Sequence, residues 1–108
     1  EQIIKIQEWL QKNYQRAISL KTLAERFDIS VRSFNRRFRI AADKTPLQYL
    51  QEVRLEQAKA LLKHSNLTVA EIAFSVGYQD TSYFAALFKR MNAVTPIEYR
   101  HLVRNYSM

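Results

Sequence analysis

The sequence LTVAEIAFSVGYQDTSYFAALFKRMNAVTPIEYR, residues 67–100, is the most informative part of this chain. Its apolar spacing and its turn residues predict a short helix, a tight turn, a second helix and the start of a third. Five residues of this segment recur fifty positions earlier, as Phe34, Phe38, Thr45, Pro46 and Tyr49. Self-similarity at a fixed spacing is typical of a repeated structural unit. The sequence therefore predicts the same helical unit twice.

Length and composition favour an all-α fold. With 108 residues, the chain can form one ordinary domain or two small units that share a core. Hydrophobic residues make up 47% of the chain, whereas one glycine and two prolines leave little material for hairpins or long loops. A large catalytic architecture is excluded at this length. The chain has no cysteine, so it forms no disulfide and no thiolate metal site.

The charge of the chain favours a polyanionic partner. The formal net charge is +7, and a basic surface of this kind suits nucleic acid before membrane. No apolar run approaches the roughly 18 residues of a membrane span. Basic residues crowd one short segment of the first repeat, at Arg32, Arg36, Arg37, Arg39 and Lys44. We therefore expect a nucleic acid partner and no membrane partner.

Seven helices follow from the apolar spacing and from helix-start signals. Side chains that can cap a helix precede four of them, at Ser19, Ser30, Thr68 and Asp80. A threonine followed by a proline opens two more, at Thr45 and Thr95. The expected helices cover residues 2–13, 20–27, 31–41, 46–64, 69–76, 81–92 and 96–103. The longest of them has an apolar side made of Leu47, Leu50, Val53, Ala58, Leu61 and Leu62.

The doubled unit has the pattern of a helix-turn-helix motif. Such a motif needs a small residue where its two helices cross and a sharp turn between them. Ala24 and Ala73 are the small residues, and Gly77 supplies the turn in the second copy. Asp28 stands at the matching turn position of the first copy, and aspartate is one of the few other residues that tolerate a positive φ. We therefore predict that Asp28 is left-handed.

The outward faces of the two second helices differ in chemistry. Phe34 and Phe38 are expected in the core, so the opposite face carries Arg32, Ser33, Asn35, Arg36 and Arg39. Arginine and asparagine can hydrogen-bond base edges, and arginine also binds phosphates. The matching face of the second copy carries Thr81, Ser82, Ala85, Ala86 and Lys89. We infer that the first copy holds more of the direct base readout.

A specific family resemblance covers nearly the whole chain. Its pattern is Ile72-Ala-x-x-Val76-Gly77-Tyr78, Asp80-x-x-Tyr83-Phe84, Phe88-Lys89-Arg90 and Thr95-Pro96-x-x-Tyr99-Arg100. This pattern resembles the DNA-binding domain of the AraC/XylS family of bacterial transcription regulators. The resemblance implies a homeodomain-like tandem, with a first helix-turn-helix subdomain at 1–44, a linker helix region at 45–66 and a second subdomain at 67–108. It also implies recognition helices at about 31–41 and 81–92 that enter successive major grooves of a promoter.

The resemblance also assigns site residues, position by position. Base-reading positions fall on Arg32, Asn35 and Arg36 in the first copy and on Thr81, Ser82, Ala85 and Ala86 in the second. Phosphate contacts are expected from Ser33, Arg37, Arg39, Lys44, Lys89 and Arg90. The chain has Asp43 and Ala93 where the family often has glycine. Ala93 would carry a strain of roughly 1 kcal/mol if left-handed, unless Asn92 takes this conformation instead.

The expected function is sequence-specific binding of double-stranded DNA by a transcription regulator, either an activator or a repressor. Expected partners are promoter DNA and RNA polymerase, in the bacterial cytoplasm and at the nucleoid. A sensory domain ahead of this segment would bind any effector. We expect neither enzymatic activity nor a cofactor, and no metal, because His64 and His101 lack ligand spacing. The alternative is a helical protein-interaction module whose basic face meets an acidic partner.

Overall fold

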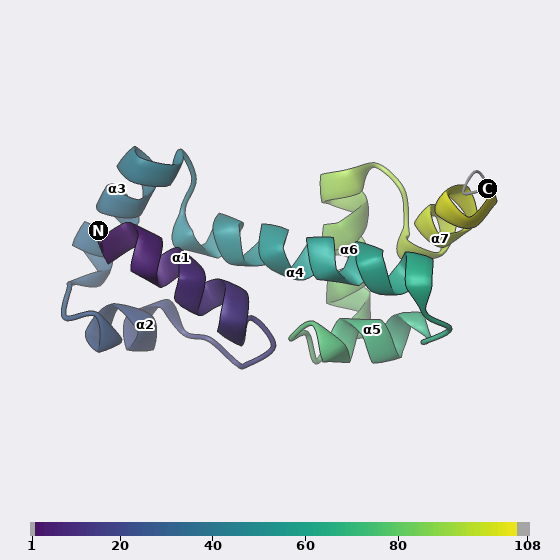
Figure 1. Cartoon of the computed structure of the whole chain (residues 1–108), viewed down its shortest axis with the longest axis horizontal. Helices are drawn as coiled ribbons and strands as arrows, with labels where there is room; N and C mark the ends of the chain where they lie inside the picture. Colours follow the sequence, from purple (N-terminus) through teal and green to yellow (C-terminus); the bar gives the residue numbers. More distant parts are fainter. Residues whose placement is uncertain (1, 106–108) are drawn as a thin grey trace. The chain divides into compact units, whose positions relative to one another are not determined.

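The computed structural model describes residues 2–105, which form seven helices and no strand. The helices are α1 (Gln2–Asn13), α2 (Leu20–Arg26), α3 (Val31–Ala42), α4 (Pro46–His64), α5 (Val69–Ser75), α6 (Thr81–Asn92) and α7 (Pro96–Asn105). Figure 1 shows them in chain order. The expected all-α fold of seven helices is confirmed. The expected bounds of α1, α4 and α6 are reproduced, and α7 ends two residues later than expected.

The chain forms two compact units, unit 1 (Glu1–Val53) and unit 2 (Arg54–Met108). The division falls inside α4, so the first half of this helix belongs to unit 1 and the second half to unit 2. The expected three-part division into 1–44, 45–66 and 67–108 instead treats the linker as a separate part. As a description of function, that division stays a prediction.

The core of unit 1 lies between α1, α2, α3 and the first half of α4. Its buried residues are Ile3, Ile6, Leu10, Leu23, Ala24, Phe34, Phe38 and Leu50. Phe34 and Phe38 pack edge to face with 6.0 Å between ring centroids, and Phe38 lies 5.6 Å from the ring of Tyr49. Aromatic pairs in this geometry add to the free energy gained by burying their area. These rings hold α3 against the start of α4.

The core of unit 2 repeats this arrangement. Its buried residues include Leu55, Ala58, Leu62, Ile72, Ala73, Val76, Phe84, Leu87 and Phe88. Phe84 and Phe88 have ring centroids 6.0 Å apart, and Phe88 lies 5.6 Å from the ring of Tyr99. Both distances equal those of the corresponding rings in unit 1. The repeat predicted from the sequence is therefore also a repeat of packing.

The predicted apolar side of α4 is wrong at its first position. Leu47 is 48% exposed, whereas Leu55, which the pattern omitted, is 3% exposed. Leu50 is buried in the core of unit 1, and five residues later Leu55 is buried in unit 2. The buried side of α4 therefore includes Leu55 and excludes Leu47.

Hydrogen bonds at three helix starts confirm the predicted capping residues. The Thr45 backbone N–H donates to Gln48 Oε1 at 2.9 Å, and the Gln48 N–H donates to Thr45 Oγ1 at 3.1 Å. Thr68 and Glu71 exchange the same pair of bonds, as do Thr95 and Glu98. These bonds satisfy N–H groups that have no partner inside the helix.

Four residues of the described chain have a positive φ, and they mark corresponding turns. Asp28 (φ 56°) ends the first turn of unit 1, as predicted, and Gly77 (φ 111°) ends its counterpart in unit 2. Asp43 (φ 59°) and Ala93 (φ 69°) end α3 and α6. The expectation that Asn92 could replace Ala93 is wrong, because Asn92 is the last residue of α6. Ala93 itself carries the strain.

Candidate DNA interface

Residues of α2 and the following turn determine which face of α3 is exposed. The Ile29 N–H donates to the carbonyl of Ala24 at 3.0 Å, which closes the turn, and Ala24 is 2% exposed where the helices cross. Ser30 Oγ accepts from the Ser33 N–H at 3.1 Å and caps α3. Phe34 and Phe38 are fully buried, so the opposite face of α3 points to solvent.

The predicted base-reading residues of unit 1 lie on this outward face. Arg32 and Arg36 are exposed and stand one turn apart, whereas Asn35 is half-buried beside them. Arg37 and Arg39, predicted to bind phosphates, are also exposed. The structure thus brings several guanidinium groups together on one short helix. Guanidinium groups can bind both base edges and phosphates.

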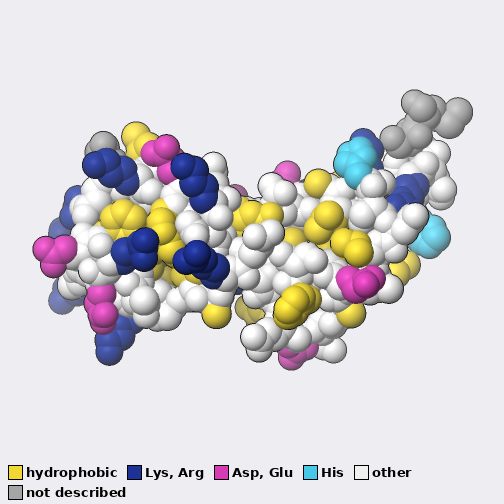
Figure 2. All heavy atoms as spheres, turned by 60° about the horizontal axis from the view of Figure 1, so that its bottom comes forward, with side chains coloured by type: hydrophobic (Ala, Val, Ile, Leu, Met, Phe, Trp, Pro, Cys, Tyr) yellow, Lys and Arg dark blue, Asp and Glu magenta, His cyan; other side chains and the backbone are white. Residues whose placement is uncertain are grey.

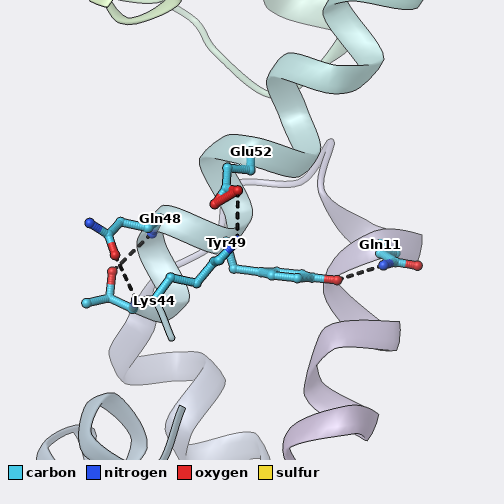
Figure 3. Close-up of polar contacts among 6 residues, drawn as sticks. Gln11, Lys44, Gln48, Tyr49 and Glu52 are labelled. Carbon is cyan, nitrogen blue, oxygen red and sulfur yellow. Dashed lines mark hydrogen bonds and ion pairs between the residues drawn. The ribbon is translucent and has the colours of Figure 1, made fainter. Parts of the chain in front are cut away.

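Lys44 and Ser33 are less available than the sequence suggested. Lys44 Nζ lies 2.9 Å from Glu52 Oε1, and Figure 3 shows this ion pair beside the start of α4. In the same view, Gln11 Nε2 donates to the hydroxyl of Tyr49 at 2.6 Å, which ties α1 to α4. Ser33 is half-buried. A role for Lys44 on phosphate would require it to leave Glu52.

The second recognition helix, α6, is positioned in the same way but presents other chemistry. The Tyr78 N–H donates to the carbonyl of Ala73 at 2.8 Å, and Asp80 Oδ1 caps α6 by accepting from Tyr83 N–H at 3.1 Å. The predicted base-reading residues are half-buried at Thr81 and Ala85 and exposed at Ser82 and Ala86. The predicted phosphate contacts, Lys89 and Arg90, are exposed. None of the four base-reading positions offers an amide or a guanidinium.

Basic side chains also gather away from α3. Figure 2 shows Lys and Arg side chains around an apolar area on the part of the molecule that contains unit 1. A pocket of this unit is lined by Trp9, Arg16, Ala17, Ile18, Ser19, Thr22, Leu23 and Arg26. The Arg26 guanidinium lies 5.2 Å from the ring centroid of Trp9. The basic surface of unit 1 therefore extends beyond α3.

Two arginines of α7 that the sequence reasoning did not assign bind the end of α4. Arg100 Nε donates to the Leu62 carbonyl at 3.0 Å, and another guanidinium nitrogen donates to the Ser65 carbonyl at 3.2 Å. Arg104 also donates to the Ser65 carbonyl. These carbonyls lack partners inside the helix, and cations are favoured at a helix C-terminus. Burial lowers the pKa of Arg100. In the sequence, Arg100 stood out only as part of the family pattern, and the carbonyl groups that it binds could not be identified there.

Other classes of site lack support within residues 2–105. No group of three or more His, Asp or Glu residues there could hold a metal ion. No helix in this range is long and apolar enough to cross a membrane. His64 is exposed at the end of α4, and His101 is exposed in the middle of α7.

Known proteins are similar in sequence to this chain. A family model described as "Helix-turn-helix domain" matches residues 23–101. The HTH-type transcriptional activator RhaS of Escherichia fergusonii is 38% identical over 92 residues, which cover 85% of this chain and 33% of that protein. RhaS of Yersinia pestis is 37% identical over 93 residues, covering 86% of this chain and 34% of that protein. The chain thus spans about a third of the length of these relatives.

Solved structures share its fold. The DNA-binding domain of AdpA, solved in complex with a target DNA, has a TM-score of 0.92 and 30% identity, covering 97% of this chain and 95% of that one. The C-terminal domain of the response regulator yesN from Fusobacterium nucleatum has a TM-score of 0.87 and 33% identity, covering 90% and 95%. A probable AraC family regulator from Rhodopseudomonas palustris has a TM-score of 0.82 and 26% identity, covering 95% and 97%. The family match runs from α2 into α7 and so includes both turns and both recognition helices. The chain therefore belongs to the AraC/XylS family of helix-turn-helix DNA-binding domains, a family of transcription regulators and not of enzymes.

Proposed function

We propose that this chain binds specific double-stranded DNA in promoters, with α3 and α6 entering successive major grooves. The observation that carries the proposal is the pair of capped, outward-facing recognition helices in a fold that matches AdpA, which was solved with its target DNA. A recognition helix supported by a shorter bracing helix is the geometry that helix-turn-helix proteins use in the major groove. The net charge of +7 supports the attraction to a polyanion.

In this proposal α3 supplies most of the direct base readout. Arg32 and Arg36 can each donate two hydrogen bonds to the O6 and N7 of guanine, and Asn35 can pair in two places with adenine. These side chains come from neighbouring positions on the outward face of α3, where Arg32 and Arg36 are exposed and Asn35 is half-buried. Their spacing allows contact with neighbouring base pairs from a single helix.

The second helix would grip DNA with less discrimination. Thr81 and Ser82 offer hydroxyls, and Ala85 and Ala86 offer methyl groups that can contact thymine methyls. Phosphate contacts are assigned to Ser33, Arg37, Arg39, Lys44, Lys89 and Arg90. The pair between Lys44 and Glu52 is partly exposed, and such pairs contribute little free energy, so phosphate can compete for the lysine.

The wider role of the protein is also proposed from its relatives. RhaS is named a transcriptional activator and is about three times longer than the matched segment. We infer that residues 45–66 act as the linker between subdomains 1–44 and 67–108, and that a further sensory domain would bind an effector. RNA polymerase at the promoter is the proposed protein partner. The proposed location is the bacterial cytoplasm, at the nucleoid.

Selection of bound duplexes from a random pool tests the proposal. We expect an enriched motif with two segments, and stronger base preference in the segment protected by unit 1. At the same salt concentration, the selected duplex should then compete far better than a random duplex of equal length. Equal competition would reduce the function to non-specific binding. Displacement by an acidic protein but by no duplex would instead support the interaction-module alternative, which the basic surface around the Trp9 pocket favours.

A further inference from the structure

Arg54 is the only charged side chain classed as buried within residues 2–105, and it is 8% exposed. It stands in α4, at the first position of unit 2. Burying a cation costs free energy unless nearby groups compensate the lost water. The surroundings of Arg54 therefore indicate what its burial achieves.

One group that faces the Arg54 guanidinium is the ring of Tyr78, at the turn between α5 and α6. The Arg54 guanidinium lies 4.9 Å from the ring centroid, which is within the range of a cation–π interaction. Tyr78 is itself 8% exposed, and its hydroxyl oxygen is buried. Burial raises the pKa of Tyr78, although the positive charge of Arg54 opposes the increase. The two side chains thus form one buried pair that joins α4 to the turn.

Tyr78 passes this contact to the start of α6. Its ring centroid lies 5.8 Å from that of Tyr83 and 5.8 Å from that of Phe84, with tilted rings. Tyr83 and Phe84 directly follow Thr81 and Ser82, which were assigned to base readout. A column of contacts therefore runs from Arg54 through Tyr78 to the first turn of α6, entirely within unit 2.

Residues 2–53 of unit 1 contain no corresponding column of contacts. Ile29 stands in the place of Tyr78 and Ser33 in the place of Tyr83, so neither position carries a ring. The core residues of α1 correspond to those of α4 with an offset of 52 positions. Gln2 is therefore the residue of unit 1 that corresponds to Arg54. Gln2 Nε2 donates a hydrogen bond of 2.8 Å to the Phe27 carbonyl at the turn. The buried arginine and its rings are therefore a feature of unit 2 and not of the repeat.

We propose that Arg54 is a positioning residue for the second recognition helix, because its guanidinium fixes Tyr78 and thereby the orientation of the first turn of α6. This inference rests on the proposed DNA-binding function. The helix that presents weak hydrogen-bonding chemistry depends most on accurate placement, since methyl and hydroxyl contacts need close approach. Arg54 thus sets how strongly unit 2 binds its part of the DNA without touching DNA.

The test compares three variants of the full chain. Arg54→Met removes the charge and keeps much of the length, whereas Arg54→Lys keeps the charge but loses the planar group. Lys59→Met is the matched control, because Lys59 is also in α4 and lies over a ring, that of Tyr99, at 5.8 Å. Tyr99 belongs to α7 and not to the first turn of α6.

Dissociation constants are measured on the selected duplex and on a version scrambled only in the segment that unit 2 protects. We expect Arg54→Met to bind the intact duplex about tenfold more weakly than the parent chain does. On the scrambled duplex, the affinities of Arg54→Met and of the parent chain should be almost equal. Arg54→Lys should recover part of the loss, and Lys59→Met should stay within about twofold of the parent. Equal losses on both duplexes, or no loss, would overturn the proposal.

Amide resonances of the free protein separate this proposal from the DNA-binding function. Arg54→Met should shift the amides of residues 81–84 and leave those of α3 unchanged, whether or not a specific duplex exists. Unchanged amides at 81–84 would refute positioning by Arg54. If Arg54→Met does not fold, as judged by helix content, the same spectra of Arg54→Lys decide the question. A parent protein without a specific duplex would contradict only the proposed function.

Discussion

The two recognition helices share a frame and differ in what they present. α3 carries four arginines and α6 presents Thr81, Ser82, Ala85 and Ala86 at the positions proposed to read bases, yet both helices pack through phenylalanines at the same ring distances. Buried positions match because each must fill the same space against equivalent neighbours. Exposed positions diverge because the fold does not constrain them. The difference shows that the residues that hold the helices in place are not the residues proposed to read DNA. Four experiments test this separation.

The largest expected effect comes from the shared frame. Phe38→Ala and Phe88→Ala should each lower the free energy of unfolding by about 3–5 kcal/mol, because each removes a fully buried ring that contacts two others. Chemical denaturation measures both losses. Phe74→Ala is the control, since Phe74 is 72% exposed and should cost under about 0.5 kcal/mol. A large loss from only one of the buried positions would break the equivalence of the two frames.

The next effect concerns readout. Arg36→Ala should cost about 1–3 kcal/mol on the selected duplex and relax preference at one base, whereas Arg37→Ala should weaken all sequences alike. Both side chains are exposed on α3, so neither change should alter folding. Binding titrations against selected and random duplexes provide the measurement. Equal losses for Arg36→Ala on both duplexes would remove it from the base-reading set.

A smaller effect should distinguish the two helix ends. Ala93→Gly should stabilise unit 2 by up to about 1 kcal/mol, because alanine at φ 69° is strained and glycine is not. Asp43→Gly at the matching end of α3 should gain less, since aspartate tolerates a left-handed conformation better. Thermal unfolding of both variants tests this order. A greater gain at Asp43 than at Ala93 would contradict it.

The smallest effect is a pH dependence confined to one copy of a cap. Hydrogen bonds from the Thr95 backbone and side chain hold the pKa of the Glu98 carboxyl below its ordinary value, whereas Gln48 at the matching position does not ionise. This stabilisation is present above the unfolded pKa and is lost as pH falls through the folded pKa. Glu98→Gln should therefore reduce the loss of stability as the pH falls from the ordinary pKa of a glutamate through the lowered pKa of Glu98. If the free energy of unfolding, measured in urea, falls equally with decreasing pH in Glu98→Gln and in the parent chain, this contribution is excluded.

Predictions from local signals were the most accurate. The capping pairs, the left-handed Asp28 and the bounds of α4 were all confirmed, since each depends on residues a few positions apart. The exposed Leu47 and the buried Leu55 were missed, because an apolar residue on a helix is buried only where another helix covers it, and local spacing does not show which positions are covered. The base and phosphate assignments stay predictions, supported by exposure at Arg32 and Arg36.

The sequence by itself determined a doubled helical unit, its caps and its turns, because those features arise from hydrogen bonds and φ angles of neighbouring residues. Only the tertiary structure decided which charged groups face solvent and which are bound to other groups of the protein. Lys44 is paired with Glu52, Arg100 holds the end of α4, and Arg54 is buried against Tyr78. The two arginines depend on partners 24 or more positions away in the chain. Which residues meet over such separations is decided by the packing of the core and not by local sequence.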